Sequence, residues 1–96
     1  MVAVLAGCHS TLSPHDNFKN SMKFHIGKKI DSPSSYVGRY PEDVGSKKKL
    51  KNGNEEIEYL MGPGHRCRVF FEVDKPSNVI VGWRFEGTQE SCVIVP

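Results

Sequence analysis

The sequence lacks the features that mark several common classes of protein. None of its apolar runs approaches the ~18 to 20 residues that a membrane-spanning helix needs. A net charge of only +2 in 96 residues falls short of the basic footprint of a nucleic-acid-binding protein. The histidines have no zinc-ligand spacing, the glycines form no phosphate-binding motif, and no carboxylate pair is placed for acid–base catalysis. We therefore expect no metal, no cofactor, no small-molecule substrate and no enzymatic activity.

Cysteine is scarce as well, since it occurs only at positions 8, 67 and 92. An odd number of cysteines calls for an explanation. A short apolar stretch ends in Leu5-Ala6-Gly7-Cys8, after which the chain turns polar. This pattern resembles the lipobox of bacterial lipoproteins, in which the signal peptide is cut before a cysteine that carries the lipid. The resemblance implies a signal-peptide remnant over 1–7, lipidation of Cys8 and a flexible tether over 8–15. The alternative is an N-terminal strand with an ordinary buried cysteine.

The residues before and after this lipobox-like motif bear on localisation. Residues 1–6 carry no cation and are shorter than a full export signal, so the natural start can lie upstream of Met1. His9, rather than aspartate, follows the cysteine, which in enterobacterial lipoproteins implies sorting to the outer membrane. The resemblance therefore predicts a lipid anchor in the outer membrane, on its periplasmic face.

Two short helices are expected after the tether. The first is predicted to be capped by Asp16 and Asn17 and to end at Gly27. The second is predicted to begin at Ser32-Pro33 and to end at Pro41. Apolar residues at helical spacing form the expected inner faces, namely Phe18, Met22 and Ile26 in the first helix and Tyr36, Val37 and Tyr40 in the second.

A sheet is expected to follow, because turn signals such as Asn52-Gly53 separate alternating segments. The expected strands are 47–51, Glu55–Met61, Cys67–Asp74 and Val79–Glu86, with 92–95 as a short strand or an extended tail. This order predicts a single α+β domain over 16–96, with two short N-terminal helices packed on one face of a three- to four-stranded antiparallel meander.

If Cys8 is lipidated, Cys67 and Cys92 remain as an even pair. A hairpin of the last two main strands places Cys67 near its open end, and residues 87–91 can curl back to bring Cys92 beside it. We predict a disulfide between them, which would persist in the periplasm. The alternative is two buried free thiols.

The outer face of the sheet is the candidate partner surface. In the last strand we expect Ile80 and Arg84 to point outward and Val81 inward. Opposite charges on this face can pair across strands, and its apolar residues can form a patch for a partner. The candidate residues are Leu60, Arg68, Phe70, Ile80 and Arg84. Alternatively, Phe70 and Ile80 only cover each other or lie under the N-terminal segment.

The lysines at positions 47, 48, 49 and 51 form the densest charged run. One interpretation is a solvated edge strand in which lysines prevent edge-to-edge pairing. The other is contact with lipid phosphates near a membrane surface.

Two short helices followed by "NGNEEIEYL", "RCRVFFEVD", "VIVGWRFEG" and a late "SCVIVP" resemble small proteobacterial outer-membrane lipoproteins of the SmpA/OmlA type, over about residues 16–95. The resemblance implies a β-lactamase-inhibitor-like ααβββ fold and, as in the best-known member, an accessory role in β-barrel assembly. That member's G-M-T helix-start motif is missing, because Gly27-Lys28-Lys29-Ile30 stands roughly in its place. The paired cysteines are not part of its pattern either. The resemblance thus supports the predicted fold and compartment more strongly than it supports a role in β-barrel assembly.

These observations together predict a lipid-anchored periplasmic protein that acts as a non-catalytic binding or scaffolding accessory of an outer-membrane or envelope complex. Its contacts would be the membrane, through the N-terminal lipid, and an envelope protein whose identity the sequence leaves open. Two alternatives are a periplasmic inhibitor that blocks a hydrolase and an accessory lipoprotein of a secretion or conjugation apparatus.

Overall fold

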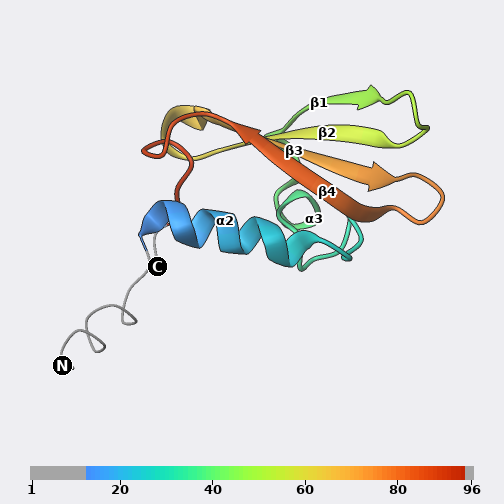
Figure 1. Cartoon of the computed structure of the whole chain (residues 1–96), viewed down its shortest axis with the longest axis horizontal. Coiled ribbons are helices and arrows are strands. Elements are labelled where there is room, and N and C mark those ends of the chain that lie inside the picture. The colour runs from blue at the N-terminus through green and yellow to red at the C-terminus, as the bar shows by residue number, and fades with distance from the viewer. Residues whose placement is uncertain (1–12, 95–96) are drawn as a thin grey trace.

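The structure, a computed structural model, describes residues 13–94 and confirms the expected α+β class. Two helices precede a four-stranded antiparallel sheet in the order β1-β2-β3-β4 (Figure 1). The elements are α2 (Pro14–His25), α3 (Tyr36–Arg39), η1 (Pro41–Asp43), β1 (Val44–Lys49), β2 (Glu55–Met61), η2 (Pro63–His65), β3 (Cys67–Asp74) and β4 (Val79–Glu86). The predicted signal remnant and Cys8 lie outside the described residues.

Helix α2 begins earlier than the sequence pattern indicates. The Ser13 hydroxyl accepts a hydrogen bond from the Asp16 N–H at 3.1 Å, and Pro14 occupies the first helical turn. Ser13 is therefore the cap in place of Asp16 and Asn17, because a serine followed by proline satisfies the free N–H groups and presets the helical φ. Pro14 and His15, expected in the tether, lie in the helix.

The end of α2 corrects a second expectation. Phe18 and Met22 are buried as expected, but the helix stops at His25 and Ile26 has extended backbone angles. Ile26 is consequently exposed instead of lying on the inner face, and His25 is buried in its place. The helical spacing that linked Ile26 to Met22 no longer holds once the helix has ended.

Helix α3 is shorter than predicted and starts later. Ser35 caps it by accepting from the Gly38 N–H at 3.0 Å, while its hydroxyl donates to the Ile30 carbonyl at 2.6 Å. A Cβ at position 38 would lie 2.1 Å from the Ser32 carbonyl oxygen, so the tight turn over Ser32 requires glycine there. The predicted start at Ser32-Pro33 is wrong, because these residues form the turn on which α3 packs.

Strands β2, β3 and β4 match their predicted bounds, and β1 is shifted. It begins at Val44, which pairs with Tyr59, and ends at Lys49, before Lys51. As the first strand of the sheet order, β1 is an edge strand, and its register is interrupted between Val44 and Lys47. Lysines and irregular pairing both discourage the addition of another strand.

A register shift in β4 reverses two expected orientations. Val73 pairs with Ile80 and Glu72 pairs with Gly82, which leaves Val81 as the extra residue of a bulge. Ile80 is therefore 0% exposed and belongs to the core, whereas Val81 is 49% exposed. The predicted outward Ile80 and inward Val81 are both wrong, because one inserted residue changes which face each side chain occupies.

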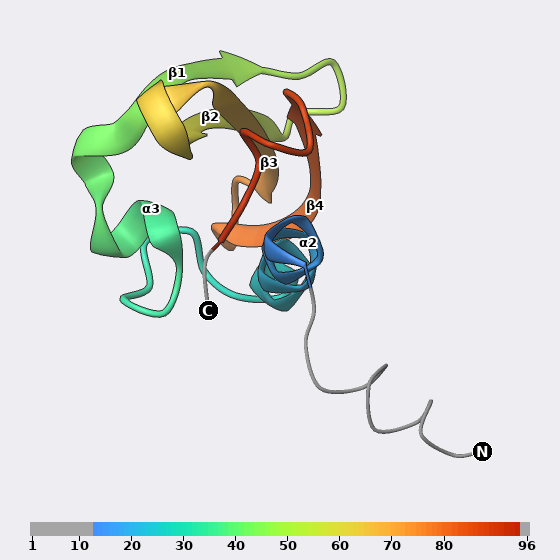
Figure 2. The ribbon, with the colours of Figure 1, turned by 90° about the vertical axis from the view of Figure 1, so that its left-hand side faces the viewer.

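The core lies between the helices and the sheet, which curves around them (Figure 2). Helix α2 covers β4 through Phe18, whose ring meets those of Trp83 and Phe85 edge-on with centroids 6.0 Å and 5.3 Å away. Helix α3 covers β2 through Tyr36, which stacks on Tyr59. Burial of this aromatic layer stabilises the domain.

His25 fixes the end of α2 against the start of α3. Its ring lies between those of Tyr36 and Phe71, each with a centroid 5.2 Å away. Nε2 accepts from the Tyr36 N–H at 3.1 Å, so Nδ1 carries the proton and donates to the Ser21 carbonyl at 2.8 Å. Both ring nitrogens are satisfied only in the neutral form, and burial lowers the pKa of His25 with a smaller contribution from the cations Lys28 and Arg39.

This arrangement predicts an acid-sensitive fold. The unfolded chain takes up a proton on His25 below its ordinary pKa of about 6.5, whereas the folded chain resists protonation until its lowered pKa is reached. The free energy of unfolding should therefore decrease as the pH falls from about 6.5 toward that lowered pKa. Urea unfolding as a function of pH measures this slope. His25→Gln should flatten it, and the exposed control His65→Gln should retain it; equal slopes in both variants would contradict the assignment.

Candidate functional site

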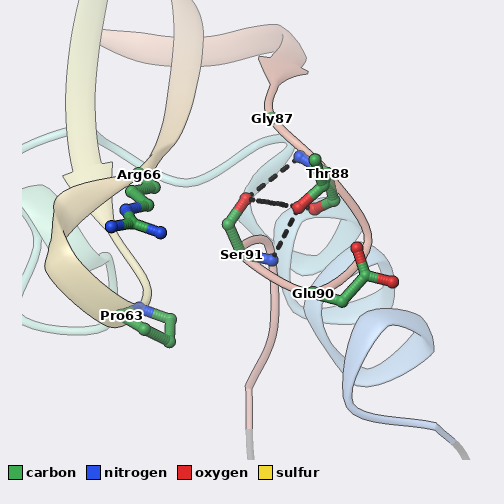
Figure 3. Close-up of a pocket in the computed structure, with 6 residues that line it drawn as sticks. All are labelled: Pro63, Arg66, Gly87, Thr88, Glu90 and Ser91. Atoms are coloured by element: carbon green, nitrogen blue, oxygen red, sulfur yellow. Dashed lines mark hydrogen bonds between the residues drawn. The ribbon is translucent and has the colours of Figure 1, made fainter.

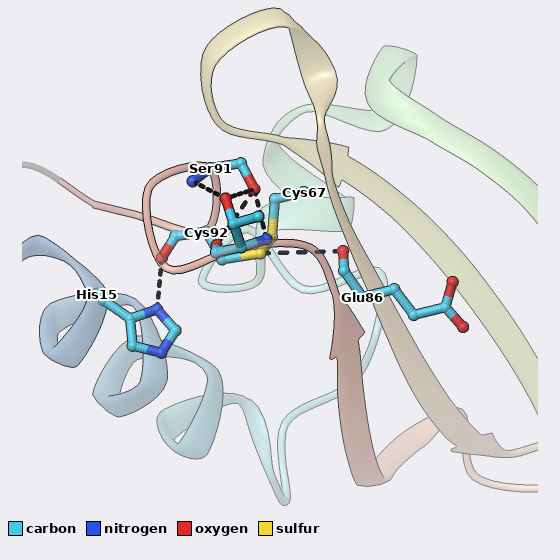
Figure 4. Close-up of a disulfide and its surroundings, with 6 residues drawn as sticks. His15, Cys67, Glu86, Ser91 and Cys92 are labelled. Carbon is cyan, nitrogen blue, oxygen red and sulfur yellow. Dashed lines mark hydrogen bonds between the residues drawn. A yellow bond between two sulfur atoms is a disulfide. The ribbon is translucent and has the colours of Figure 1, made fainter.

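The predicted disulfide between Cys67 and Cys92 is present, with Cα atoms 4.9 Å apart (Figure 4). Cys67 opens β3, and Cys92 follows the loop over 87–91, which returns from the end of β4. Gly87 permits this return, since it has φ +147° and a Cβ there would lie 2.9 Å from the Cys92 Sγ. Both cysteines are fully buried.

The segment after the disulfide holds the start of α2. The His15 ring donates from Nδ1 to the Cys92 carbonyl at 2.9 Å (Figure 4), and the Ile94 N–H donates to the Pro14 carbonyl at 3.0 Å. The Asn17 amide donates to the Ile94 carbonyl at 3.4 Å. Residues 92–94, expected as a short strand or an extended tail, form no strand. They connect the first turn of α2 through the disulfide to β3.

The outer face of the sheet holds four of the five candidate partner residues, namely Leu60, Arg68, Phe70 and Arg84. Phe70 lies on β3 with the guanidinium carbons of Arg68 and Arg84 at 5.1 Å and 4.0 Å from its ring centroid. Leu60 is half-buried opposite Arg68 in the β2–β3 register. Ile80 is absent from this face because of the β4 bulge. Phe70 is therefore covered by arginines, and not by Ile80.

The expected cross-strand charge pairs on this face form a connected chain. Arg84 binds Glu56 on β2 at 3.1 Å and Glu86 on its own strand at 3.1 Å. Arg68 binds Glu86 at 2.9 Å and also Glu58, and this second hydrogen bond is the main reason why the pKa of Glu58 is lowered. Each arginine thus meets two carboxylates while stacking on Phe70, which arranges the guanidinium groups and leaves Phe70 itself only 7% exposed.

A pocket that the sequence analysis missed lies beside the disulfide (Figure 3). It has a volume of about 270 Å³ and is lined by Pro63, Arg66, Gly87, Thr88, Glu90 and Ser91. One wall is the η2 segment before β3, and the other is the loop between β4 and Cys92. Only two features of the sequence could have indicated this pocket: an arginine next to Cys67 and small polar residues before Cys92. The disulfide brings these two features close together.

Within residues 13–94, no helix has the length and apolarity needed to span a membrane. The same residues contain no group of three or more His, Cys, Asp or Glu side chains placed to hold a metal ion. Comparison with protein-family models, curated proteins and solved structures finds no match to this chain. The lipoprotein resemblance therefore remains a prediction.

The disulfide should make a large contribution to stability. It closes a loop with a sequence separation of 25 residues. In the chain-entropy model such a cross-link contributes about 3.5 kcal/mol. Urea unfolding of the Cys67→Ser/Cys92→Ser double variant should show a loss of that size, with the parent chain in reductant as the matched control.

Thiol counting on the oxidised, denatured and unlipidated chain should find one reactive group, Cys8; three reactive groups would contradict the bridge.

The covered position of Phe70 predicts a structural cost when it is truncated. Phe70 is 7% exposed although it lies on the outer face, whereas Phe24 on α2 is 72% exposed. Phe70→Ala should lower the free energy of unfolding by about 3 kcal/mol, since it leaves a void under the two arginines. Phe24→Ala is the matched control and should change it by less than about 0.5 kcal/mol. Chemical denaturation of both variants tests this, and similar losses in the two would contradict the described outer face.

Proposed function

We propose that the protein is a lipoprotein, anchored through Cys8 to the periplasmic face of the outer membrane, which acts as a non-catalytic binding or scaffolding accessory of an envelope complex. The observation that carries the proposal is the Cys67–Cys92 disulfide. It accounts for two of the three cysteines and leaves Cys8, which follows Leu5-Ala6-Gly7, as the third. A disulfide also suits an oxidising compartment such as the periplasm.

The contacts at the start of α2 support the same proposal. Mechanical force on a tethered domain acts at the point where the tether joins it, and here that point is Ser13-Pro14. The Pro14 carbonyl and the His15 ring are bonded to residues 92–94, which the disulfide connects to β3. Force on the N-terminal segment would therefore pass to an inner strand of the sheet, instead of unwinding the first turn of α2.

The partner surface that we propose is the outer face of the sheet, centred on Arg68, Phe70 and Arg84. Helices α2 and α3 fill the other side of the curved sheet (Figure 2), so the outer face is the broad sheet surface left to a partner. Its guanidinium groups are held in place by carboxylates and by the Phe70 ring. Arranged arginines beside an aromatic ring are favoured at protein interfaces. No nucleic-acid contact is part of this proposal.

The anchor is tested by Cys8→Ser, with the protein expressed from its own gene in its own cells. Cys8→Ser should abolish labelling by radioactive palmitate and move the protein from the membrane to the soluble periplasmic fraction, because the acylated side chain is gone. Cys67→Ser/Cys92→Ser is the matched control, and it should keep the label even if its abundance falls. A Cys8→Ser protein that still carries the label and still fractionates with membranes would exclude the anchor at this position.

A further inference from the structure

The pocket beside the disulfide has walls that are fixed before any ligand arrives (Figure 3). Thr88 and Ser91 are joined by hydrogen bonds from the Thr88 N–H to the Ser91 hydroxyl at 3.0 Å and from the Ser91 N–H to the Thr88 hydroxyl at 3.1 Å. Gly62, next to Pro63, packs so closely that a Cβ would lie 2.0 Å from the Ser91 carbonyl oxygen. The disulfide joins the two walls. A wall that is held in this way loses little conformational entropy when a ligand binds.

Arg66 differs from the arginines of the outer face in having no carboxylate partner among residues 13–94. Arg68 and Arg84 each bind two carboxylates, whereas the Arg66 guanidinium makes no ion pair or side-chain hydrogen bond with a described residue. It extends from its wall toward Thr88 and Ser91 on the opposite wall (Figure 3). A free guanidinium in a concave site is suited to a planar anion, which it can bind through two parallel hydrogen bonds.

The remaining groups of the pocket restrict the class of anion. The N–H groups of Thr88, Ser91 and Cys92 are already used within the loop, so these three backbone donors are not available to a phosphate. Glu90 adds a negative charge to the lining, which disfavours a dianion. Pro63 and Gly87 supply apolar surface. A single guanidinium beside the apolar surface of Pro63 and Gly87 fits a carboxylate that carries a small apolar group.

We infer that this pocket binds the free carboxylate end of a short peptide, with the carboxylate paired to Arg66 and the terminal side chain against Pro63. The site is distinct from the outer face of the sheet and does not depend on the proposed anchor at Cys8. A volume of about 270 Å³ suits one or two small residues. It adds a second binding function to the domain.

The test uses the oxidised full chain and the probe N-acetyl-alanyl-alanine, with its C-terminal amide as the matched ligand. In titrations followed by amide chemical shifts, the acid should move Arg66, Gly87, Thr88 and Ser91 in a saturable manner, and the amide should not. Arg66→Gln should weaken binding about tenfold or more, because it removes both charge-assisted hydrogen bonds. The affinity of Arg66→Lys should lie between those of the parent chain and Arg66→Gln, because lysine keeps the charge and loses the planar fork.

Two further variants separate the site from a general charge effect. Arg39→Gln removes the same charge from α3, which does not line the pocket, and should leave the affinity unchanged. Glu90→Gln removes the nearby negative charge and should tighten binding about twofold. Equal binding of acid and amide, unchanged affinity in Arg66→Gln, tighter binding of inorganic phosphate, or no saturable shifts at these amides would each overturn the inference. Dispersed spectra of the variants establish that they are folded.

Discussion

The cross-link between Cys67 and Cys92 is the interaction on which the rest of the structure depends. It joins the first residue of an inner strand to a segment that otherwise has little regular structure. Through the Cys92 carbonyl and Ile94, that segment also holds the first turn of α2. A chain of this size buries a small core, so a covalent link that fixes three separate parts of the fold replaces packing that the domain is too small to provide.

The two faces of the sheet meet different physical demands. On the inner face, aromatic rings from α2 and α3 cover β2, β3 and β4. On the outer face no helix lies over Phe70, and its burial is achieved by the two arginines that stack on it. Carboxylates from β2 and β4 hold those arginines in place. The surface around Phe70 is therefore charged and ordered, with guanidinium groups within reach of a partner.

Much of the fold could be predicted from sequence, because the relevant signals are local. Turn residues and alternating side chains defined β2, β3 and β4 to their observed bounds, and cysteine arithmetic identified the disulfide. The bulge at Val81 could not be predicted, because an inserted residue is detectable only once β3 and β4 are paired. The same holds for the arginines over Phe70 and for the pocket at Arg66, since both combine residues that only the register or the disulfide brings together.

Helix α2 illustrates how little of its stability comes from its own sequence. A helix of 12 residues is marginal in isolation. Its start is held by the disulfide segment through His15, and its end is held by the ring of His25 between Tyr36 and Phe71. Both histidines act through hydrogen bonds to backbone groups of distant residues, Cys92 and Tyr36. The predicted caps, Asp16-Asn17 and Gly27, misplaced both ends of this helix, whereas apolar spacing correctly identified Phe18 and Met22 as its buried face.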